Sequence, residues 1–80
     1  MAYREFSDME GRAWRVWDTY PEKPQLVRPV YENGWLCFEG DGEKRRLAPI
    51  PAEWVEADGP ALASLLARAS PMGAVPAAAG

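Results

Sequence analysis

The sequence predicts a small α+β domain in which an antiparallel sheet of three or four strands carries one C-terminal amphipathic helix. Two observations favour this class. Short stretches that alternate apolar and polar residues, separated by turn residues, fill the first two thirds of the chain, as in antiparallel strands. A stripe of leucines at helical spacing follows near the C-terminus, and so short an amphipathic helix needs a sheet to pack on.

Two strands are expected in the N-terminal part of the chain. Residues 3–7 form the first, and residues 8–11 form a turn that ends in a glycine. Residues 12–20 then alternate in polarity, so that Trp14 and Val16 share one face of the second strand.

A hairpin is expected in the middle of the chain. The Asn-Gly pair at residues 33–34 is a strong turn signal before an alternating strand at residues 35–39. Residues 40–43 have the composition of a hairpin loop, and residues 44–48 supply the second strand. The proline-rich residues 21–29 exclude a regular helix and are predicted to form an extended loop.

The last third of the chain contains the expected helix. Asp58 is placed to cap it, and Pro60 lies in its first turn. Its apolar stripe consists of Leu62, Leu65, Leu66 and Ala69. Pro71 ends it, so we assign residues 1–70 to one domain and residues 71–80 to a flexible tail of Ala, Pro and Gly.

The predicted core relies on aromatic side chains. The chain has four tryptophans and three tyrosines, and each such residue buries roughly 150–250 Å². The expected core residues are Phe6, Trp14, Val16, Leu36, Phe38, Leu47, Ile50, Trp54, Leu62, Leu65 and Leu66.

The composition disfavours several classes of function. Nine basic residues against twelve acidic ones give a net charge of −3, with a pI near 4.8, which disfavours non-specific binding to nucleic acid or to an anionic membrane. The chain has no histidine, which is the commonest general base and metal ligand. No apolar stretch is long enough to span a bilayer, and the first residues do not resemble a signal peptide. We therefore expect no metal, no cofactor, no membrane partner and a cytoplasmic location.

Residues with nucleophilic side chains have simpler structural explanations. The serines Ser7, Ser64 and Ser70 have no histidine to activate them. Cys37 lies in the middle of a strand, where a small half-buried residue is expected, and one cysteine can form neither an internal disulfide nor a zinc site. The acidic residues Asp41 and Glu43 lack the spacing of a calcium loop. We therefore predict that the protein is not an enzyme.

The spacing of the tryptophans indicates a second apolar face on the sheet. Trp14 and Trp17 are three residues apart, so they point to opposite faces of one strand. One helix covers only one face, and exposed aromatic patches mark interfaces. The predicted partner-binding residues are Arg15, Trp17, Trp35, Arg45 and Arg46. Alternatively, residues 21–29 and Trp54 fold over this face, or a bulge realigns the strand.

Three segments carry a resemblance to other sequences. They are R-x-W-x-V-W at residues 12–17, GWLCFE at residues 34–39 and RRL-x-PIP-x-x-W at residues 45–54. Over residues 3–69 this layout resembles a group of short bacterial hypothetical proteins from GC-rich genomes, for which no activity is established. The resemblance implies a small, stand-alone bacterial domain in the cytoplasm and implies no reaction.

Taken together, these patterns predict a small protein-binding module that serves as a regulatory or accessory subunit and docks on a larger bacterial assembly. The same aromatic and basic residues are also typical of single-stranded nucleic-acid binders, which stack bases on aromatic rings and pair phosphates with arginines. A homodimeric structural protein joined through an edge strand is the third hypothesis.

Overall fold

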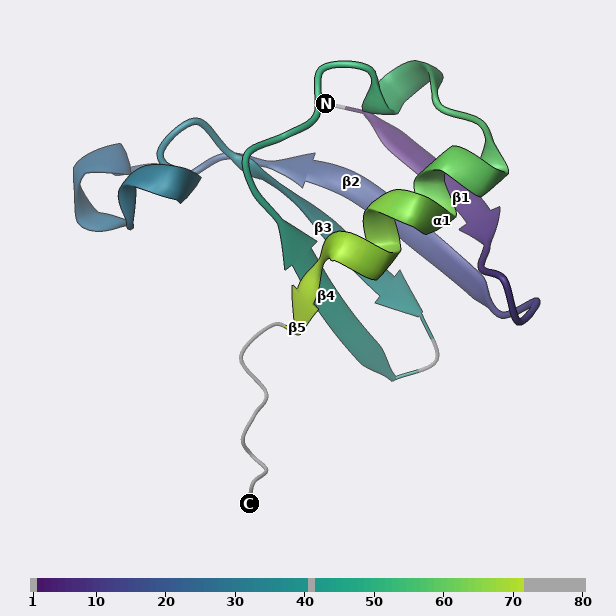
Figure 1. Cartoon of the computed structure of the whole chain (residues 1–80). Helices are drawn as coiled ribbons and strands as arrows, with labels where there is room; N and C mark the ends of the chain where they lie inside the picture. The colour runs from purple at the N-terminus through teal and green to yellow at the C-terminus, as the bar shows by residue number, and fades with distance from the viewer. Residues whose placement is uncertain (1, 41, 72–80) are drawn as a thin grey trace.

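The computed structural model describes residues 2–40 and 42–71 and has a single antiparallel sheet in the strand order β1-β2-β3-β4-β5. The strands are β1 (Tyr3–Ser7), β2 (Ala13–Thr19), β3 (Trp35–Gly40), β4 (Glu43–Leu47) and β5 (Ser70–Pro71). Among the described residues, one α-helix, α1 (Gly59–Arg68), and the chain that leads to it lie over one side of the sheet (Figure 1). The α+β class is confirmed, with five strands where three or four were predicted.

The additional strand follows α1 directly. Ser70 pairs with Arg46 and Pro71 pairs with Arg45, so two residues after the helix extend the sheet beyond β4. A proline is tolerated here because β5 is an edge strand, where the missing backbone N–H leaves no gap in the ladder. Residues 72–80, which make up the rest of the predicted tail, lie outside the described part of the chain.

The core lies between the sheet and α1. It comprises Phe6, Trp14, Val16, Leu36, Phe38, Leu47, Trp54, Leu62, Ala63, Leu65 and Leu66. Every residue of the predicted core is buried except Ile50, which is half-buried and packs against the cluster. The helix begins as predicted, because Asp58 accepts a hydrogen bond from the Ala61 backbone N–H at 3.0 Å.

Arg4 ties the connection between β4 and α1 to strand β1. Its guanidinium donates hydrogen bonds to the carbonyls of Trp54, Val55 and Ala57, the last at 2.8 Å. These carbonyls belong to the short 3-10 turn η3 (Trp54–Glu56) and the residue that follows it. The connection therefore has a fixed place over β1 immediately before the helix starts.

Asp18 extends the helix-side face of β2 to the strand's end. It is 8 % exposed and accepts hydrogen bonds from the Ala2 backbone N–H and the Tyr20 hydroxyl, both at 3.0 Å. Burial raises the pKa of Asp18, but these hydrogen bonds favour the ionised form and outweigh it, so the pKa is lowered overall. The carboxylate thereby fixes the start of β1 against the end of β2.

The prolines of residues 21–29 form two short turns where an extended loop was predicted. These are the 3-10 turns η1 (Pro24–Leu26) and η2 (Pro29–Tyr31), and each begins with a proline. The reason is that proline's fixed φ suits the first position of a helical turn as well as it suits an extended loop. Both turns lie beyond the ends of β2 and β3 (Figure 1), where Leu26 is 73 % exposed.

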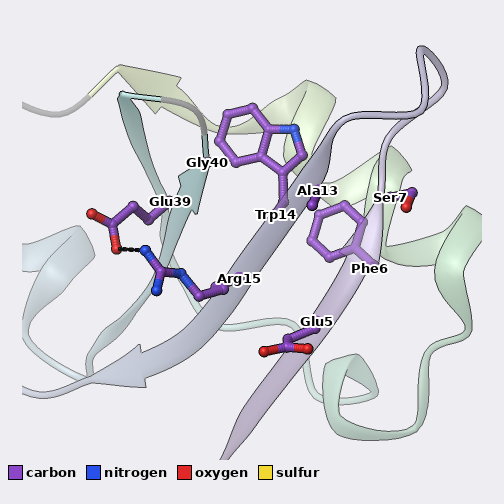
Figure 2. Close-up of a pocket in the computed structure, with 8 residues that line it drawn as sticks. All are labelled: Glu5, Phe6, Ser7, Ala13, Trp14, Arg15, Glu39 and Gly40. Carbon is purple, nitrogen blue, oxygen red and sulfur yellow. Dashed lines mark hydrogen bonds and ion pairs between the residues drawn. The ribbon is translucent and has the colours of Figure 1, made fainter.

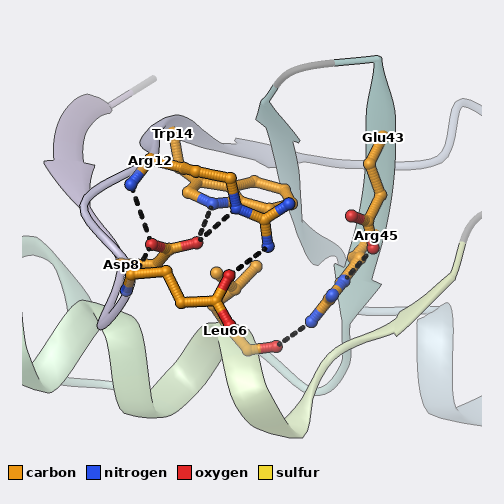
Figure 3. A network of polar contacts seen from close by, with 7 residues as sticks. Asp8, Arg12, Trp14, Glu43, Arg45 and Leu66 are labelled. Atoms are coloured by element: carbon orange, nitrogen blue, oxygen red, sulfur yellow. Dashed lines mark hydrogen bonds and ion pairs between the residues drawn. The ribbon is translucent and has the colours of Figure 1, made fainter.

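A polar network surrounds the edge of Trp14 (Figure 3). Asp8 accepts hydrogen bonds from the Trp14 indole N–H at 2.8 Å and from the backbone N–H groups of Glu10 and Arg12, both at 2.9 Å. The backbone bond from Arg12 and the indole bond lower the pKa of Asp8 to about 2. One carboxylate thus holds both the β1–β2 turn and one of the two core tryptophans.

Asp8→Asn is expected to lower the melting temperature at neutral pH by about 4–8 °C, the equivalent of one lost hydrogen bond in a domain of this size. The asparagine amide N–H₂ would face the indole N–H, so two donors would meet. Because folding lowers the pKa of Asp8, its stabilising contribution is complete above pH 4 and disappears as the pH falls towards 2. Thermal unfolding followed by circular dichroism should show the two proteins converging below pH 3, and a constant difference from pH 7 to pH 2 would contradict this role.

Candidate functional site

The face of the sheet opposite α1 holds the candidate site, and we call it the open face. Strand alternation and the strand register define its residues. They are Tyr3, Glu5, Ser7, Ala13, Arg15, Trp17, Thr19, Trp35, Cys37, Glu39, Lys44 and Arg46. The helix-side core contains none of them. Trp54, one candidate cover for this face, belongs to that core and is 3 % exposed.

One row across the open face alternates in charge. The register places Glu5 opposite Arg15, Arg15 opposite Glu39 and Glu39 opposite Lys44, in the order of the four strands. Arg15 and Glu39 form an ion pair at 2.7 Å, and Lys44 approaches Glu39 at 4.0 Å. The row therefore presents two negative and two positive groups, with its central pair already joined.

The next row, which we call the aromatic row, contains two aromatic residues among its four. It runs Tyr3, Trp17, Cys37, Arg46 from β1 to β4. Tyr3 is 54 % exposed and Trp17 is half-buried, whereas Cys37 is only 7 % exposed and its Sγ lies 3.2 Å from the Thr19 hydroxyl. The large rings therefore stand at the β1–β2 side of this row and a small buried residue stands on β3.

Trp35 lies at the β3 end nearest η2 and contacts that turn. The Tyr31 ring packs edge-on against Trp35 at 5.6 Å between centroids, and the Arg46 guanidinium lies over the Tyr31 ring at 4.4 Å. The indole N–H of Trp35 is buried and has no hydrogen-bond partner among the described residues. Turn η2, which begins at the last residue of the predicted cover (residues 21–29), thus brings Tyr31 to the margin of the face, while Val30 beside it is 46 % exposed.

A shallow hollow lies at the end of the sheet opposite to Trp35, where β1 and β2 approach the turn that joins them (Figure 2). Its lining comprises Glu5, Ser7, Ala13, Arg15 and Glu39 of the open face, together with Phe6, Trp14 and Gly40, whose strand positions face the helix side. Its volume is about 530 Å³. Its arginine is already paired with Glu39 at 2.7 Å. The charged groups at this end of the face therefore partly neutralise each other.

The structure brings four of the five predicted site residues together. Arg15, Trp17, Trp35 and Arg46 lie on the open face. Arg45 lies on the opposite face, where it donates hydrogen bonds to Glu43 at 2.6 Å and to the Leu66 carbonyl at 3.3 Å, and packs over Trp14 (Figure 3). The reason is elementary, because neighbouring residues of a regular strand point to opposite faces.

Sequence reasoning missed several members of the face. The register adds Tyr3, Glu5, Glu39 and Lys44, and the loop adds Tyr31. The first four could have been found by aligning the two hairpins through their turns, which sets the register. Tyr31 carries no such signal, because its position depends on how two proline turns place the chain.

Comparison of the chain with family models, with curated proteins and with solved structures gives no match. In the described ranges no three His, Cys, Asp or Glu residues are grouped so that they could hold a metal ion. The one α-helix described is too short to cross a membrane.

Proposed function

We propose that this chain is a non-enzymatic protein-binding module, an accessory subunit that docks on another polypeptide of a larger assembly through the open face. Trp17 and Trp35 serve as its apolar anchors, and Arg15 and Arg46 form its polar rim. The observation that supports this proposal is the row of aromatic and basic side chains on a sheet face that α1 does not cover. Trp, Tyr and Arg are the residues that most often dominate binding energy at protein interfaces.

The charges of the open face favour a protein over single-stranded nucleic acid as the partner. Two carboxylates, Glu5 and Glu39, stand among the basic residues, and Arg15 is already paired with one of them at 2.7 Å. A phosphate backbone gains most from uncompensated positive charge, whereas alternating charges suit a protein surface with its own alternating charges. The net charge of −3 adds to this preference.

Affinity purification with the tagged chain, with and without nuclease, tests this function. We expect a stoichiometric protein that survives nuclease. The variant with Trp17→Ala and Trp35→Ala should bind this partner at least about 30-fold more weakly, since the loss of one interface anchor alone has that effect. The matched control is Leu26→Ala with Val55→Ala, two exposed apolar residues outside the open face, which should retain the partner.

Three results would contradict the proposal. Loss of every bound species after nuclease would indicate nucleic acid, and binding that falls steeply between about 50 and 200 mM salt would accompany it. Retention of the partner by the folded double variant would place the site elsewhere. Unfolding of both single variants, seen by circular dichroism, would assign the two tryptophans to the core.

A further inference from the structure

The geometry points to a second copy of this chain as the occupant of the open face, docked sheet against sheet about a two-fold axis parallel to the strands, midway between β2 and β3. This inference rests on the proposed function and names the partner. The smallest assembly in which the chain is a subunit is then its own dimer.

The symmetry fixes which strands face each other. A two-fold axis parallel to the strands reverses the strand order and keeps each residue's position along the strand. Strand β1 therefore faces β4 of the second copy, and β2 faces β3 of the second copy. Such aligned packing of two sheets, about 10 Å apart, is the usual arrangement in β-sandwiches, and most homodimers use a two-fold axis with one patch meeting itself.

The charged row is complementary to itself under this symmetry. Read from β1 to β4, its signs are negative, positive, negative, positive. Reversal places Glu5 against Lys44 of the second copy and Arg15 against Glu39 of the second copy. All four positions then meet the opposite sign, and the Arg15–Glu39 pairs of the two copies form one network of charges.

The large and small side chains are complementary in the same way. The aromatic row places Trp17 against Cys37 of the second copy, so a large ring meets a small buried residue. In the row beside it, Trp35 meets Thr19 of the second copy. At the margin, Tyr3 meets Arg46 of the second copy, a pairing of an exposed ring with a guanidinium. Alternation of large and small residues is what lets two sheets interdigitate.

The other two-fold arrangement of the two faces lacks this fit. An axis in the interface but perpendicular to the strands sets each strand against its own copy and reverses position along the strand. If it passes through the charged row, like charges meet. If it passes midway between the two rows, the charged row meets the aromatic row. Both Trp17 residues would then face charged groups, which would lose water without gaining a partner of opposite sign. Only the axis parallel to the strands satisfies both rows at once.

Sedimentation equilibrium of charge-reversed variants tests this inference. Arg15→Glu with Lys44→Glu makes the row entirely acidic, and Glu5→Lys with Glu39→Lys makes it entirely basic. We expect the wild-type chain to reach twice its 8.9 kDa mass, each variant alone to dimerise at least about tenfold more weakly, and an equimolar mixture of the two to recover the dimer. Lys23→Glu with Arg28→Glu changes the charge equally on exposed loop residues and should dimerise like the wild type.

Reversal of charge within one row also changes the ion pairs of the single folded chain. Two milder tests are therefore the double variant Arg15→Gln with Lys44→Gln and the single variant Trp17→Ala. Both are expected to weaken dimerisation. A wild-type chain that stays monomeric at millimolar concentration overturns the inference, and so does a mixture that stays monomeric while the wild type dimerises. If the wild type is monomeric and yet Trp17→Ala with Trp35→Ala releases a different protein, the inference fails and the proposed function stands. If neither binding is found, both fail.

Discussion

Trp14→Ala is expected to lower the free energy of unfolding by about 3–5 kcal/mol, the cost of removing a buried tryptophan from a core. The side chain is 2 % exposed and belongs to the cluster between the sheet and α1. A domain of this length has roughly 4–12 kcal/mol of stability in total. The substitution therefore removes a large share of it, and a substantial unfolded population is expected at 37 °C.

Several contacts that depend on the Trp14 ring disappear together in this variant. The Asp8 carboxylate loses the indole N–H as a donor, and the Arg45 guanidinium loses the ring face that it covers at 5.4 Å from the centroid. The ring also lies directly over Gly40, where an added Cβ would come within 2.8 Å of it. Alanine therefore leaves a cavity above this backbone.

Urea unfolding followed by circular dichroism measures this effect. Trp17→Ala removes the same atoms from a half-buried position on the open face and should cost less than about 2 kcal/mol. Trp14→Phe keeps a ring but loses the indole N–H, and should lie between the two. If Trp14→Ala and Trp17→Ala were equally destabilised, the two faces of the sheet would not differ as the structure implies.

The four long strands and the core could be predicted because each strand has one buried face. Alternation with period two then decides which residue points inward, and the Gly-containing turns decide where each strand ends. Strand β2 is such a case. Trp14 and Val16 were predicted to share one face and Trp17 to lie on the other, and the first two are buried whereas Trp17 is half-buried. The leucine stripe of α1 and its Asp58 cap were predictable for the same local reasons.

Features that depend on distant contacts could not be predicted. Ser70 and Pro71 have no strand-like pattern and pair only because α1 delivers them to the free edge of β4. Tyr31 reaches Trp35 because two proline turns carry it there. The charged row was visible as separate residues in the sequence, but its alternation appears only once the register aligns four strands.

Arg45 illustrates a different limit. An arginine at position 45 suits a polar rim as well as one at position 46 does. Because the two are adjacent in the sequence, both were assigned to one site. The two side chains cannot share a face, because neighbouring residues of a strand point to opposite sides of the sheet. On the helix side, Glu43 and the Leu66 carbonyl accept hydrogen bonds from Arg45, and its guanidinium lies over the Trp14 ring. A basic residue facing the core is therefore structural here, and the open face is less basic than the sequence suggests.

Gly34→Ala is expected to destabilise the chain by about 2–4 kcal/mol, because two costs coincide at this turn before β3. Its φ is +100°, a left-handed conformation that costs an alanine about 1–2 kcal/mol. The added Cβ would also come within 2.6 Å of the Tyr20 ring and 2.8 Å of the Thr19 carbonyl oxygen. The carbonyl belongs to the backbone of β2, and the Tyr20 ring is held by its hydrogen bond to Asp18, so neither neighbour yields easily.

Gly11→Ala is the matched control for the steric part of this cost. Its φ is +83°, but an added Cβ there would have no atom within 4 Å, so only the backbone cost of about 1–2 kcal/mol applies. Urea unfolding should place Gly34→Ala at least about 1 kcal/mol below Gly11→Ala, and equal stabilities would contradict the close approach at Gly34. Because Gly34 precedes Trp35 and follows the turn that carries Tyr31, the same variant should weaken binding at the open face even where the chain remains folded, whereas Gly11→Ala should not.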